Sequence, residues 1–447
     1  MKYKKSSQVM VSLAVAGAAL GVIGEANASG FALVEQSVKQ VGSAISGGAA
    51  SAEDASTVFF NPAGMTRLKG TQVVAGGHLI SPSSKFSGSA SIAGLLPISG
   101  TNGGDAGSAA LVPSLYVSHE LNERLRLGLG IGAPFGLSTE YDNDWVGRYH
   151  AIKSEVSTFN INPSVAYKVN DQLSLGAGIS VMRASAELSN AVDYSALCLN
   201  NLPAATCGVL GLTSMGDTAT DGLVSIEGDD WGYGFNLGLL YELTEQTRIG
   251  ASYRSKVKQE LEGTVDFSSP GGITTFDAVL ADGDASAAVD LPASLSLSVV
   301  TRVAPKLEMM ADVTWTQWSS FDELRIVLAQ SPYESVQPEN WDDTYKVSLG
   351  FNYLYNNQWT WRGGIAYDQT PIPSSEYRTP RIPGNDRKWL AGGFTYTASP
   401  AMSVDFALAH LFVSDTSINL TNDNGYILTG SYESDVNILS AQLNWQF

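Results

Sequence analysis

The sequence contains few of the residues on which enzymes and metal sites most often depend. Among its 447 residues are four histidines and two cysteines. No histidine lies in a convincing arrangement with a serine or aspartate, as acid–base or nucleophilic catalysis would require; the four are His78, His119, His150 and His410. Metal-ligand spacing is missing too, because Asp282-Gly283-Asp284 is more typical of a solvated loop than of a Ca²⁺ site. We therefore expect no enzyme, no cofactor and no metal.

The two cysteines, Cys198 and Cys207, lie close together in one predicted external loop. In an oxidising compartment a disulfide across such a loop is favoured over two free thiols. A two-thiol metal site would need further ligands, and no histidine is near in sequence. The sequence therefore predicts a Cys198–Cys207 disulfide.

Long apolar runs are missing after the first 28 residues. No later stretch offers the roughly 18 consecutive apolar residues of a transmembrane helix. Residues 1–28 combine three early lysines with an apolar stretch over residues 9–23 and end in Ala26-Asn27-Ala28. This pattern predicts a secretory signal peptide that is cleaved before Ser29.

Basic residues are a minority, with 26 lysines and arginines against 44 acidic residues. Residues 1–28 hold three lysines and one glutamate, so their removal leaves 23 basic and 43 acidic residues and a net charge of −20. Such an acidic chain is not expected to bind nucleic acid or an anionic surface.

Alternation of apolar and polar residues is what the sequence has in abundance. At the C-terminus Ser440, Gln442, Asn444 and Gln446 alternate with apolar residues, which places the two sets on opposite faces of a strand. One face suits lipid and the other a polar lumen, and averaging the two gives a mean hydropathy of only +0.01. The apolar face consists of Leu439, Ala441, Leu443, Trp445 and Phe447.

Short polar joints alternate with long loops along residues 70–447, and together they divide this part into strands. Six joints, at residues 121–124, 169–172, 243–246, 303–306, 355–358 and 398–401, with seven long loops between them, predict fourteen strands. The predicted fold is all-β, a 14-stranded antiparallel transmembrane β-barrel of the outer membrane of a Gram-negative bacterium. The expected strands cover residues 71–80, 110–121, 124–136, 154–168, 171–187, 230–243, 247–262, 288–303, 306–318, 342–355, 358–368, 387–397, 401–413 and 435–447.

The segment before the first strand, residues 29–69, lacks strand alternation and is rich in serine, alanine and glycine. Short turns face the periplasm in such barrels, so this segment enters from the periplasmic side. It is too long for a tail and too apolar for plain disorder, and a fourteen-strand barrel needs filling if it is not to leak. We expect a signal peptide over residues 1–28, a plug in the lumen over 29–69 and the barrel over 70–447.

Several motifs stand at definite places in the plug, in the third strand and towards the C-terminus. They are Ser29-Gly30-Phe31, Glu53-Asp54-Ala55, Phe60-Asn61-Pro62-Ala63-Gly64-Met65, the segment from Gly132 to Tyr141 with Trp145-Val146-Gly147-Arg148-Tyr149, and the segments from Asp368 to Pro373 and from Arg381 to Trp389. With the strand count and plug length, they resemble the FadL family of outer-membrane transporters for hydrophobic molecules, including its TodX-like members for aromatic hydrocarbons. The resemblance covers the whole chain after residue 28. The C-terminal aromatic, Phe447, likewise resembles the signal read by the outer-membrane assembly machinery.

The resemblance implies passive uptake of a hydrophobic molecule, with long-chain fatty acids expected first and monocyclic aromatic hydrocarbons as the alternative. Loops capture the ligand, the N-terminal end of the plug shifts, and the ligand leaves sideways through a kinked third strand. Such a route avoids lipopolysaccharide, which a hydrophobic molecule crosses poorly, and delivers it into membrane lipid. The expected partners are this ligand, lipopolysaccharide with outer-membrane lipid, and the assembly machinery; the protein is expected to be a monomer. A general porin or an adhesin barrel is the alternative of another class.

The residues expected to form the gate and ligand path come from these motifs. They are Phe31, Asn61, Pro62 and Ala63 of the plug, Pro134, Phe135 and Leu137 of the third strand, and Asp368 and Arg381 near the C-terminus. Proline removes a ladder donor and glycine weakens pairing, so residues 132–136 should break or bulge the third strand. Structural roles stay open: Phe31 as a buried anchor, Asn61 and Pro62 as turn formers, Pro134 and Phe135 as an ordinary bulge, and Asp368 with Arg387 as a stabilising charge network.

Two long loops carry apolar residues suited to ligand capture. In loop 188–229 we single out Leu197, Leu199 and Leu202, and in loop 263–287 Phe276, Val279 and Leu280 at helical spacing. Exposed apolar patches are costly unless they bind something or one another. Ligand capture and mutual packing of the loops are therefore both open.

The ligand's headgroup is the point at which the chain departs from the fatty-acid-transporting relatives. There, basic side chains near the ends of the fifth and tenth strands meet the ligand carboxylate, and the matching positions here are Asn190 and Asp342. Other cations have to substitute if the ligand is an acid. The candidates are Arg148, Arg183, Arg378 and Arg381.

Overall fold

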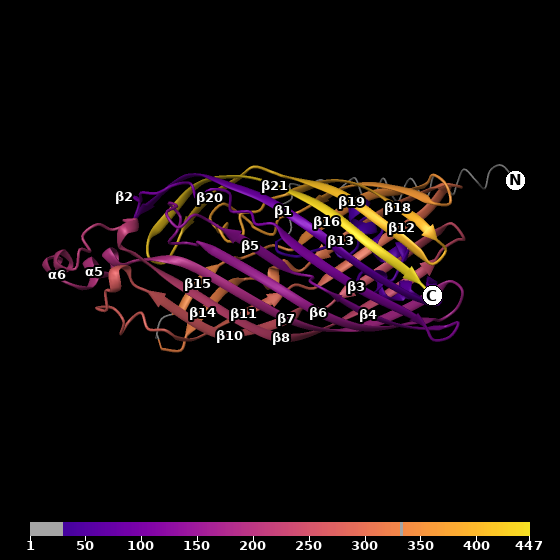
Figure 1. Ribbon diagram of the computed structural model, residues 1–447, viewed down its shortest axis with the longest axis horizontal. Coiled ribbons are helices and arrows are strands. Elements are labelled where there is room, and N and C mark those ends of the chain that lie inside the picture. Colours follow the sequence, from indigo (N-terminus) through magenta and orange to yellow (C-terminus); the bar gives the residue numbers. More distant parts are fainter. Residues whose placement is uncertain (1–29, 331–333) are drawn as a thin grey trace.

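The computed structural model describes residues 30–330 and 334–447, and in them one antiparallel sheet closes into a barrel (Figure 1). The first strand pairs with the second on one side and with the last strand on the other, which closes the ring. The predicted fourteen-strand barrel is thereby confirmed within the described residues. The predicted signal peptide, residues 1–28, lies outside them. The ring consists of β1 (Thr71–Ile92), β3 (Ala110–Glu120), β4 (Leu125–Gly132), β6 (Lys153–Lys168), β7 (Leu173–Asp193), β8 (Asp221–Glu242), β9 (Thr247–Arg254), β12 (Ser294–Ala304), β13 (Leu307–Thr316), β16 (Thr344–Leu354), β17 (Trp359–Asp368), β18 (Arg387–Ser399), β19 (Met402–Val413) and β21 (Tyr426–Gln446).

The alternation in the sequence becomes the two faces of the barrel wall. In β21, Leu439 and Trp445 are about half exposed on the outside, whereas Ser440 and Gln442 are buried on the lumen side. Lipid covers the first set and the polar lumen the second, as period-two patterning requires. No helix within the described ranges is long and apolar enough to cross a bilayer.

Several strands continue beyond the ends that the sequence predicted, all on the side of the long loops. β1 and β21 stay paired as far as Ile92 and Tyr426, where the sequence placed a loop. The prediction was wrong there because the alternation rule assumes lipid on one face, and above the membrane that constraint ends. Further strands extend the sheet in the same region: β2 (Leu96–Pro97), β5 (Gly136–Glu140), β10 (Val257–Ser268), β11 (Gly283–Leu291), β14 (Glu323–Leu328), β15 (Glu334–Pro338) and β20 (Thr416–Thr421).

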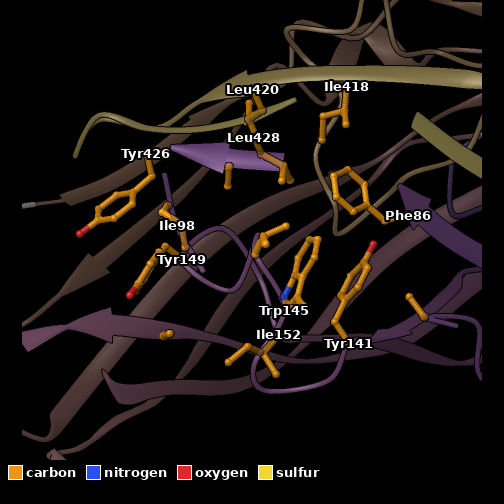
Figure 2. Packing of buried hydrophobic residues seen from close by; sticks show 14 of the residues in the cluster. Phe86, Ile98, Tyr141, Trp145, Tyr149, Ile152, Ile418, Leu420, Tyr426 and Leu428 are labelled. Atoms are coloured by element: carbon orange, nitrogen blue, oxygen red, sulfur yellow. The ribbon is translucent and has the colours of Figure 1, made fainter. Parts of the chain in front are cut away.

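Above the membrane, segments from β1, β20, β21 and the loop after β5 pack around Trp145, which is fully buried. Figure 2 shows its indole beside the ring of Tyr141, and the two rings are stacked with centroids 4.0 Å apart. Phe86 meets the Trp145 indole edge-on at 5.6 Å. This aromatic packing fixes the loop that follows the third strand.

The N-terminal segment is folded inside the barrel as short helices. α2 (Val38–Gly42) contacts β18 and β19, α3 (Gly48–Ser51) contacts β9 and β12, and the 3₁₀ helix η1 (Pro62–Arg67), which follows α4 (Thr57–Phe60), contacts β6, β7 and β8. These contacts reach walls on opposite sides, so residues 30–68 fill the lumen; we call this segment the plug.

Glycines of the wall make this close approach possible. A Cβ at Gly250 would lie 1.8 Å from the carbonyl oxygen of Ala49, and one at Gly364 would lie 2.1 Å from that of Ser43. The plug contributes small side chains and a tight turn in which Ala44 and Ile45 have positive φ. Backbone therefore packs almost directly on backbone.

Candidate functional site

Phe31, at the start of the plug, is enclosed by aromatic side chains from distant parts of the chain. Its ring centroid lies 5.0 Å from that of Trp318, 5.8 Å from Phe321 and 6.1 Å from both Phe135 and Trp341. Trp318 and Phe321 lie between β13 and β14, and Trp341 lies between β15 and β16. We call the four residues around Phe31 the aromatic cage; they are Phe135, Trp318, Phe321 and Trp341. Edge-to-face and tilted pairs of this kind favour a defined ring position.

The third strand is interrupted next to this cage. β4 ends at Gly132, β5 resumes at Gly136, and both pair with β6. The side chain of Thr158 occupies the gap in the ladder, because its Oγ1 accepts a hydrogen bond from the Phe135 N–H at 3.0 Å and donates one to the Phe135 carbonyl at 2.6 Å. The break expected at residues 132–136 is present.

The N-terminal end of the plug holds this break from inside the barrel. Leu33 N–H donates to the Pro134 carbonyl at 2.8 Å, and Gly136 N–H donates to the Phe31 carbonyl at 3.0 Å. Ala32 and Phe135 thus face each other as a single antiparallel bridge. Because each side satisfies backbone groups of the other, a shift of the plug end leaves the break unsupported.

A cavity of about 90 Å³ opens beside Phe31. Its walls come from β5, β6, β7, β8, β10, β11 and β14, together with the loops that carry Phe321, Glu339 and Arg381. Most of the wall is aliphatic, which suits a hydrophobic ligand. Its apolar lining includes Leu137, Val156, Leu188, Ile226, Leu261, Val289, Leu291, Leu324, Ile326 and Ile382.

Arg381 brings a positive charge to this cavity. Its guanidinium donates to Ser154 Oγ at 2.8 Å, to the Lys153 carbonyl at 3.2 Å and to Asn190 Oδ1 at 3.5 Å. Burial lowers the pKa of Arg381 to about 10, which still leaves it charged at neutral pH. In the parts of the chain that the structure describes, no other lining residue is a cation.

A smaller void of about 10 Å³ lies on the wall side of the break, lined by Gln36, Phe59, Pro134 and residues of β3, β4 and β6. Gln36 spans the gap, since its Nε2 donates to the Ala133 carbonyl at 2.8 Å. Phe31 lines the larger cavity and contacts Phe135, whose neighbour Pro134 lines the small void. The arrangement is a hydrophobic chamber, an aromatic stopper and an interrupted wall.

Residues 19–447 match the sequence profile of a family described as outer membrane protein transport protein (OMPP1/FadL/TodX). The chain belongs to this family. It is 30% identical to the long-chain fatty acid transport protein of Escherichia coli O6:H1 over 90% of each chain. Among solved structures, it resembles a Pseudomonas aeruginosa FadL homologue with a TM-score of 0.85 and 27% identity, over 94% of this chain and 100% of the other. The Pseudomonas putida toluene transporter TodX shares the fold at 20% identity, with a TM-score of 0.69 over 92% and 98% of the chains.

Membership of the FadL/TodX family identifies the chain as an outer-membrane transporter of hydrophobic compounds and not an enzyme. The fold of the described residues and the family's transport role agree with the sequence-based assignment.

The gate residues expected from the FadL-like motifs fall into two groups. Phe31, Leu137 and Arg381 line the cavity, and Pro134 lines the small void. Asn61, Pro62 and Ala63 are remote from both: Asn61 Oδ1 caps η1 by accepting from Ala63 N–H, and its Nδ2 donates to carbonyls of Ala49 and Leu239. All three residues lie between the plug and the wall, which fits the turn-forming role that the sequence left open for Asn61 and Pro62. Asp368 is buried at the end of β17, opposite Arg387 in the register, and is absent from the cavity lining.

The loop residues expected to capture ligand pack mostly on one another, at the tip of the molecule. Phe276 is buried against Tyr194, with ring centroids 5.8 Å apart. Cys198 and Cys207 form a disulfide between α5 (Tyr194–Asn201) and α6 (Ala204–Val209), which lie at the left end of Figure 1. Leu197, Leu199, Leu202 and Leu280 pack partly buried on this group, whereas Val279 is 65% exposed.

The two positions that match the headgroup-binding residues of the fatty-acid-transporting relatives, Asn190 and Asp342, lie in different surroundings. Asn190 contacts Arg381, whereas Asp342 is exposed and away from the cavity. Of the substitute cations, Arg148 is buried in an ion pair with Asp221, and Arg183 is half-exposed in one with Asp229.

Sequence reasoning did not single out the aromatic cage residues Trp318, Phe321 and Trp341, or Glu339. They lie in irregular segments between strands, where periodicity carries no signal. The one available signal was the density of aromatic residues at 315–321 and 341–345.

Proposed function

We propose that the protein admits long-chain fatty acids by passive diffusion, through capture at the outer loops, storage in the cavity and lateral exit at the break in the third strand. The observation that carries this proposal is that Phe31 simultaneously borders the cavity and hydrogen-bonds, through its carbonyl, to the break. One movement of residues 30–33 therefore opens the cavity and releases the wall. The name of the 30% identical E. coli relative supports the choice of fatty acids.

The first step takes place at the loop tip, where exposed Val279 and Val209 border the packed loop cluster. An alkyl chain gains about 0.8 kcal/mol for each CH₂ that leaves water. Capture on the loops and transfer into an apolar cavity are then both downhill, and no energy source is needed.

This chain has Asn190 and Asp342 where the fatty-acid-transporting relatives carry basic residues. In the cavity, Arg381 supplies the positive charge instead. Its guanidinium lies beside Asn190 and is the one cation in the described lining of a mostly aliphatic chamber. A carboxylate that pairs with a buried guanidinium gains a charge-assisted hydrogen bond. This residue supports an acid headgroup.

The axial route is blocked by buried ion pairs, one within the plug and one between the plug and the barrel. Lys39 contacts Asp54 at 3.0 Å, and Glu53 contacts Arg362 of β17 at 2.8 Å. A hydrophobic ligand would have to desolvate these charges to pass. Exit through the wall meets lipid directly, and we therefore assign residues 29–69 to the plug and residues 70–447 to the transporting barrel.

Monocyclic aromatic hydrocarbons are the second candidate. The aromatic cage around Phe31 offers ring faces and edges that a flat aromatic ligand can contact. Arg381 would then have no role in recognition, and its removal would leave uptake of such a ligand unchanged.

The decisive experiment replaces Phe31 with alanine and measures uptake of a labelled long-chain fatty acid by cells that lack other transporters for it. We expect uptake to rise severalfold, because cavity and break become continuous. Phe394→Ala, on the outer wall, is the matched control and is expected to leave uptake unchanged. Unchanged uptake in Phe31→Ala would remove Phe31 from the gate, and a steady open pore in single-channel recordings of the wild type would favour a porin instead.

A further inference from the structure

Glu339 is an acidic residue in the cavity that the proposed function does not yet use. It lies between β15 and β16, is 2% exposed and lines the same cavity as Arg381. Its Oε2 accepts a hydrogen bond from the Trp341 indole N–H at 3.0 Å. In the described residues its carboxyl group makes no ion pair, although Arg381 is near enough to act on it electrostatically.

A carboxyl group in this position favours its neutral form. Taking a carboxylate out of water without a paired cation is costly, and such a group keeps its proton instead. Burial raises the pKa of Glu339 to about 8, against the lowering effects of the Trp341 hydrogen bond and the Arg381 charge. At neutral pH the charged Arg381 and the protonated carboxyl group of Glu339 therefore line the same cavity.

Further titratable groups surround Glu339 and Arg381. Glu227 of β8 is exposed and lines the cavity. Asp322 is also exposed, and its backbone carbonyl accepts a hydrogen bond from the Glu339 N–H. Beside Arg381, burial lowers the pKa of His150 to about 4 and raises the pKa of Tyr141 above its ordinary value. Of the buried groups Glu339, Arg381, His150 and Tyr141, Glu339 has the pKa nearest to neutral pH.

We propose that Glu339, in its protonated form, donates a hydrogen bond to the anionic headgroup held by Arg381, and that this headgroup site closes when Glu339 ionises. The inference rests on the proposed function, because it names the chemistry by which the same cavity recognises an acid. A carboxylate accepts from both partners at once, one charged and one neutral, which are among the stronger hydrogen bonds in proteins. When Glu339 is ionised, its carboxylate instead repels the anionic ligand and neutralises the positive charge of Arg381.

Selectivity follows from this arrangement. Below about pH 8 Glu339 does not offset the charge of Arg381, so the site favours an anionic amphiphile over an uncharged one of the same chain length. Above this pH the dissociation constant of the anion rises by up to tenfold per pH unit, because one proton must be taken up before binding. An uncharged alcohol shows no such change.

The test uses the purified full-length barrel in detergent and measures the dissociation constants of dodecanoate, 1-dodecanol and 1-dodecanesulfonate from pH 6.5 to 9.5. The sulfonate stays ionised throughout, so its pH dependence reports the protein. For the wild type we expect its dissociation constant to rise at least tenfold between pH 7 and 9.5, and that of 1-dodecanol to stay constant. In Glu339→Gln, whose amide cannot ionise, we expect the rise to disappear. Glu376→Gln, on the exposed part of the Arg381 loop, should keep the wild-type profile.

A second measurement on the wild type alone guards against misfolding of the variant. Titration calorimetry of the sulfonate at pH 9 in buffers of different ionisation enthalpy should show uptake of about one proton. A flat wild-type profile, or the same rise in Glu339→Gln, would overturn the role of Glu339 and leave fatty-acid transport intact. Failure of the wild type to bind dodecanoate at pH 7 would contradict the proposed function itself.

Discussion

In the proposed function, Arg381 binds the ligand headgroup and Phe31 closes the cavity that holds the ligand chain. Arg381 is held by Ser154 and Asn190 with its charge unpaired, whereas Phe31 is held by rings and by two backbone hydrogen bonds. The sequence singled out both residues from their motifs. It did not predict which of four arginines would enter the cavity, because this depends on how the loop between β17 and β18 folds over the barrel.

Replacement of Arg381 by methionine is expected to weaken fatty-acid binding by roughly 10- to 100-fold, since a hydrogen bond to a charged group is worth about 1.5–3 kcal/mol. Binding of 1-dodecanol should change little, because methionine keeps much of the apolar stem. The measurement is a pair of binding isotherms at pH 7.

Arg183→Met is the matched control, since Arg183 is half-exposed in an ion pair with Asp229. Equal loss of acid and alcohol binding in Arg381→Met would indicate a collapsed cavity and not a lost headgroup contact.

At the scale of elements, the break between β4 and β5 and the plug end form one unit. Proline and the flanking glycines of the sequence predicted an interruption in the third strand, and the structure contains it. The partner of the interruption was not predictable, because the hydrogen bond between Leu33 and Pro134 joins segments about a hundred residues apart and leaves no periodic pattern in the sequence.

A cross-link between these segments should stop transport. Ala32 and Phe135 face each other as an antiparallel bridge, so cysteines at both positions can form a disulfide. In a Cys198→Ala/Cys207→Ala background, we expect fatty-acid uptake to be lost on oxidation and restored by a reductant. Full uptake by completely cross-linked protein would rule out a shift of the plug end, and the single variant Phe135→Cys controls for loss of the ring.

Protonation of Glu53 in acid is expected to weaken the contact between the plug and β17, which depends on its ion pair with Arg362. Burial raises the pKa of Glu53, but the charges of Arg362 and Lys39 lower it by more, so that it falls to about 2. A carboxylate with a depressed pKa stabilises the folded state above its unfolded pKa of about 4.5, and this contribution is lost as the pH falls towards 2. Single-channel recordings should therefore show increasing open events between pH 4.5 and 2.

Glu53→Gln should show the same open events already at pH 7, because breaking a buried ion pair costs about 3–5 kcal/mol. Glu123→Gln, in an exposed periplasmic turn, serves as the control. Closed channels in Glu53→Gln at every pH would show that the plug does not depend on this pair.

At the scale of the whole molecule, the described plug and barrel are fitted through glycines. Gly250→Ala places a methyl group against the Ala49 carbonyl oxygen, a backbone atom that cannot rotate away. We expect the free energy of unfolding to fall by about 1–3 kcal/mol, as for overpacked cores. Gly392→Ala, whose added Cβ would meet nothing nearer than 3.8 Å, is the control; equal thermal stability of the two variants in detergent would contradict close plug–wall packing.

The strand count, the membrane-facing pattern and the presence of a filled lumen followed from the sequence because alternation is enforced by lipid along every strand. The extensions of β1, β8 and β21 and the cavity did not follow, since beyond the membrane no single solvent imposes a pattern. The apolar residues that line the cavity, such as Leu188 and Ile326, come from separate strands. The alternation that predicts the barrel therefore does not predict the cavity.

The seam between β1 and β21 has a consequence for how the protein is made. These strands are the first and last of the barrel, so the ring is complete only after the C-terminal residues have paired with β1. The plug immediately precedes β1 and occupies the space that this pairing encloses. Completion of the wall therefore depends on the last residues of the chain, and the segment that this wall encloses is the one that directly precedes its first strand.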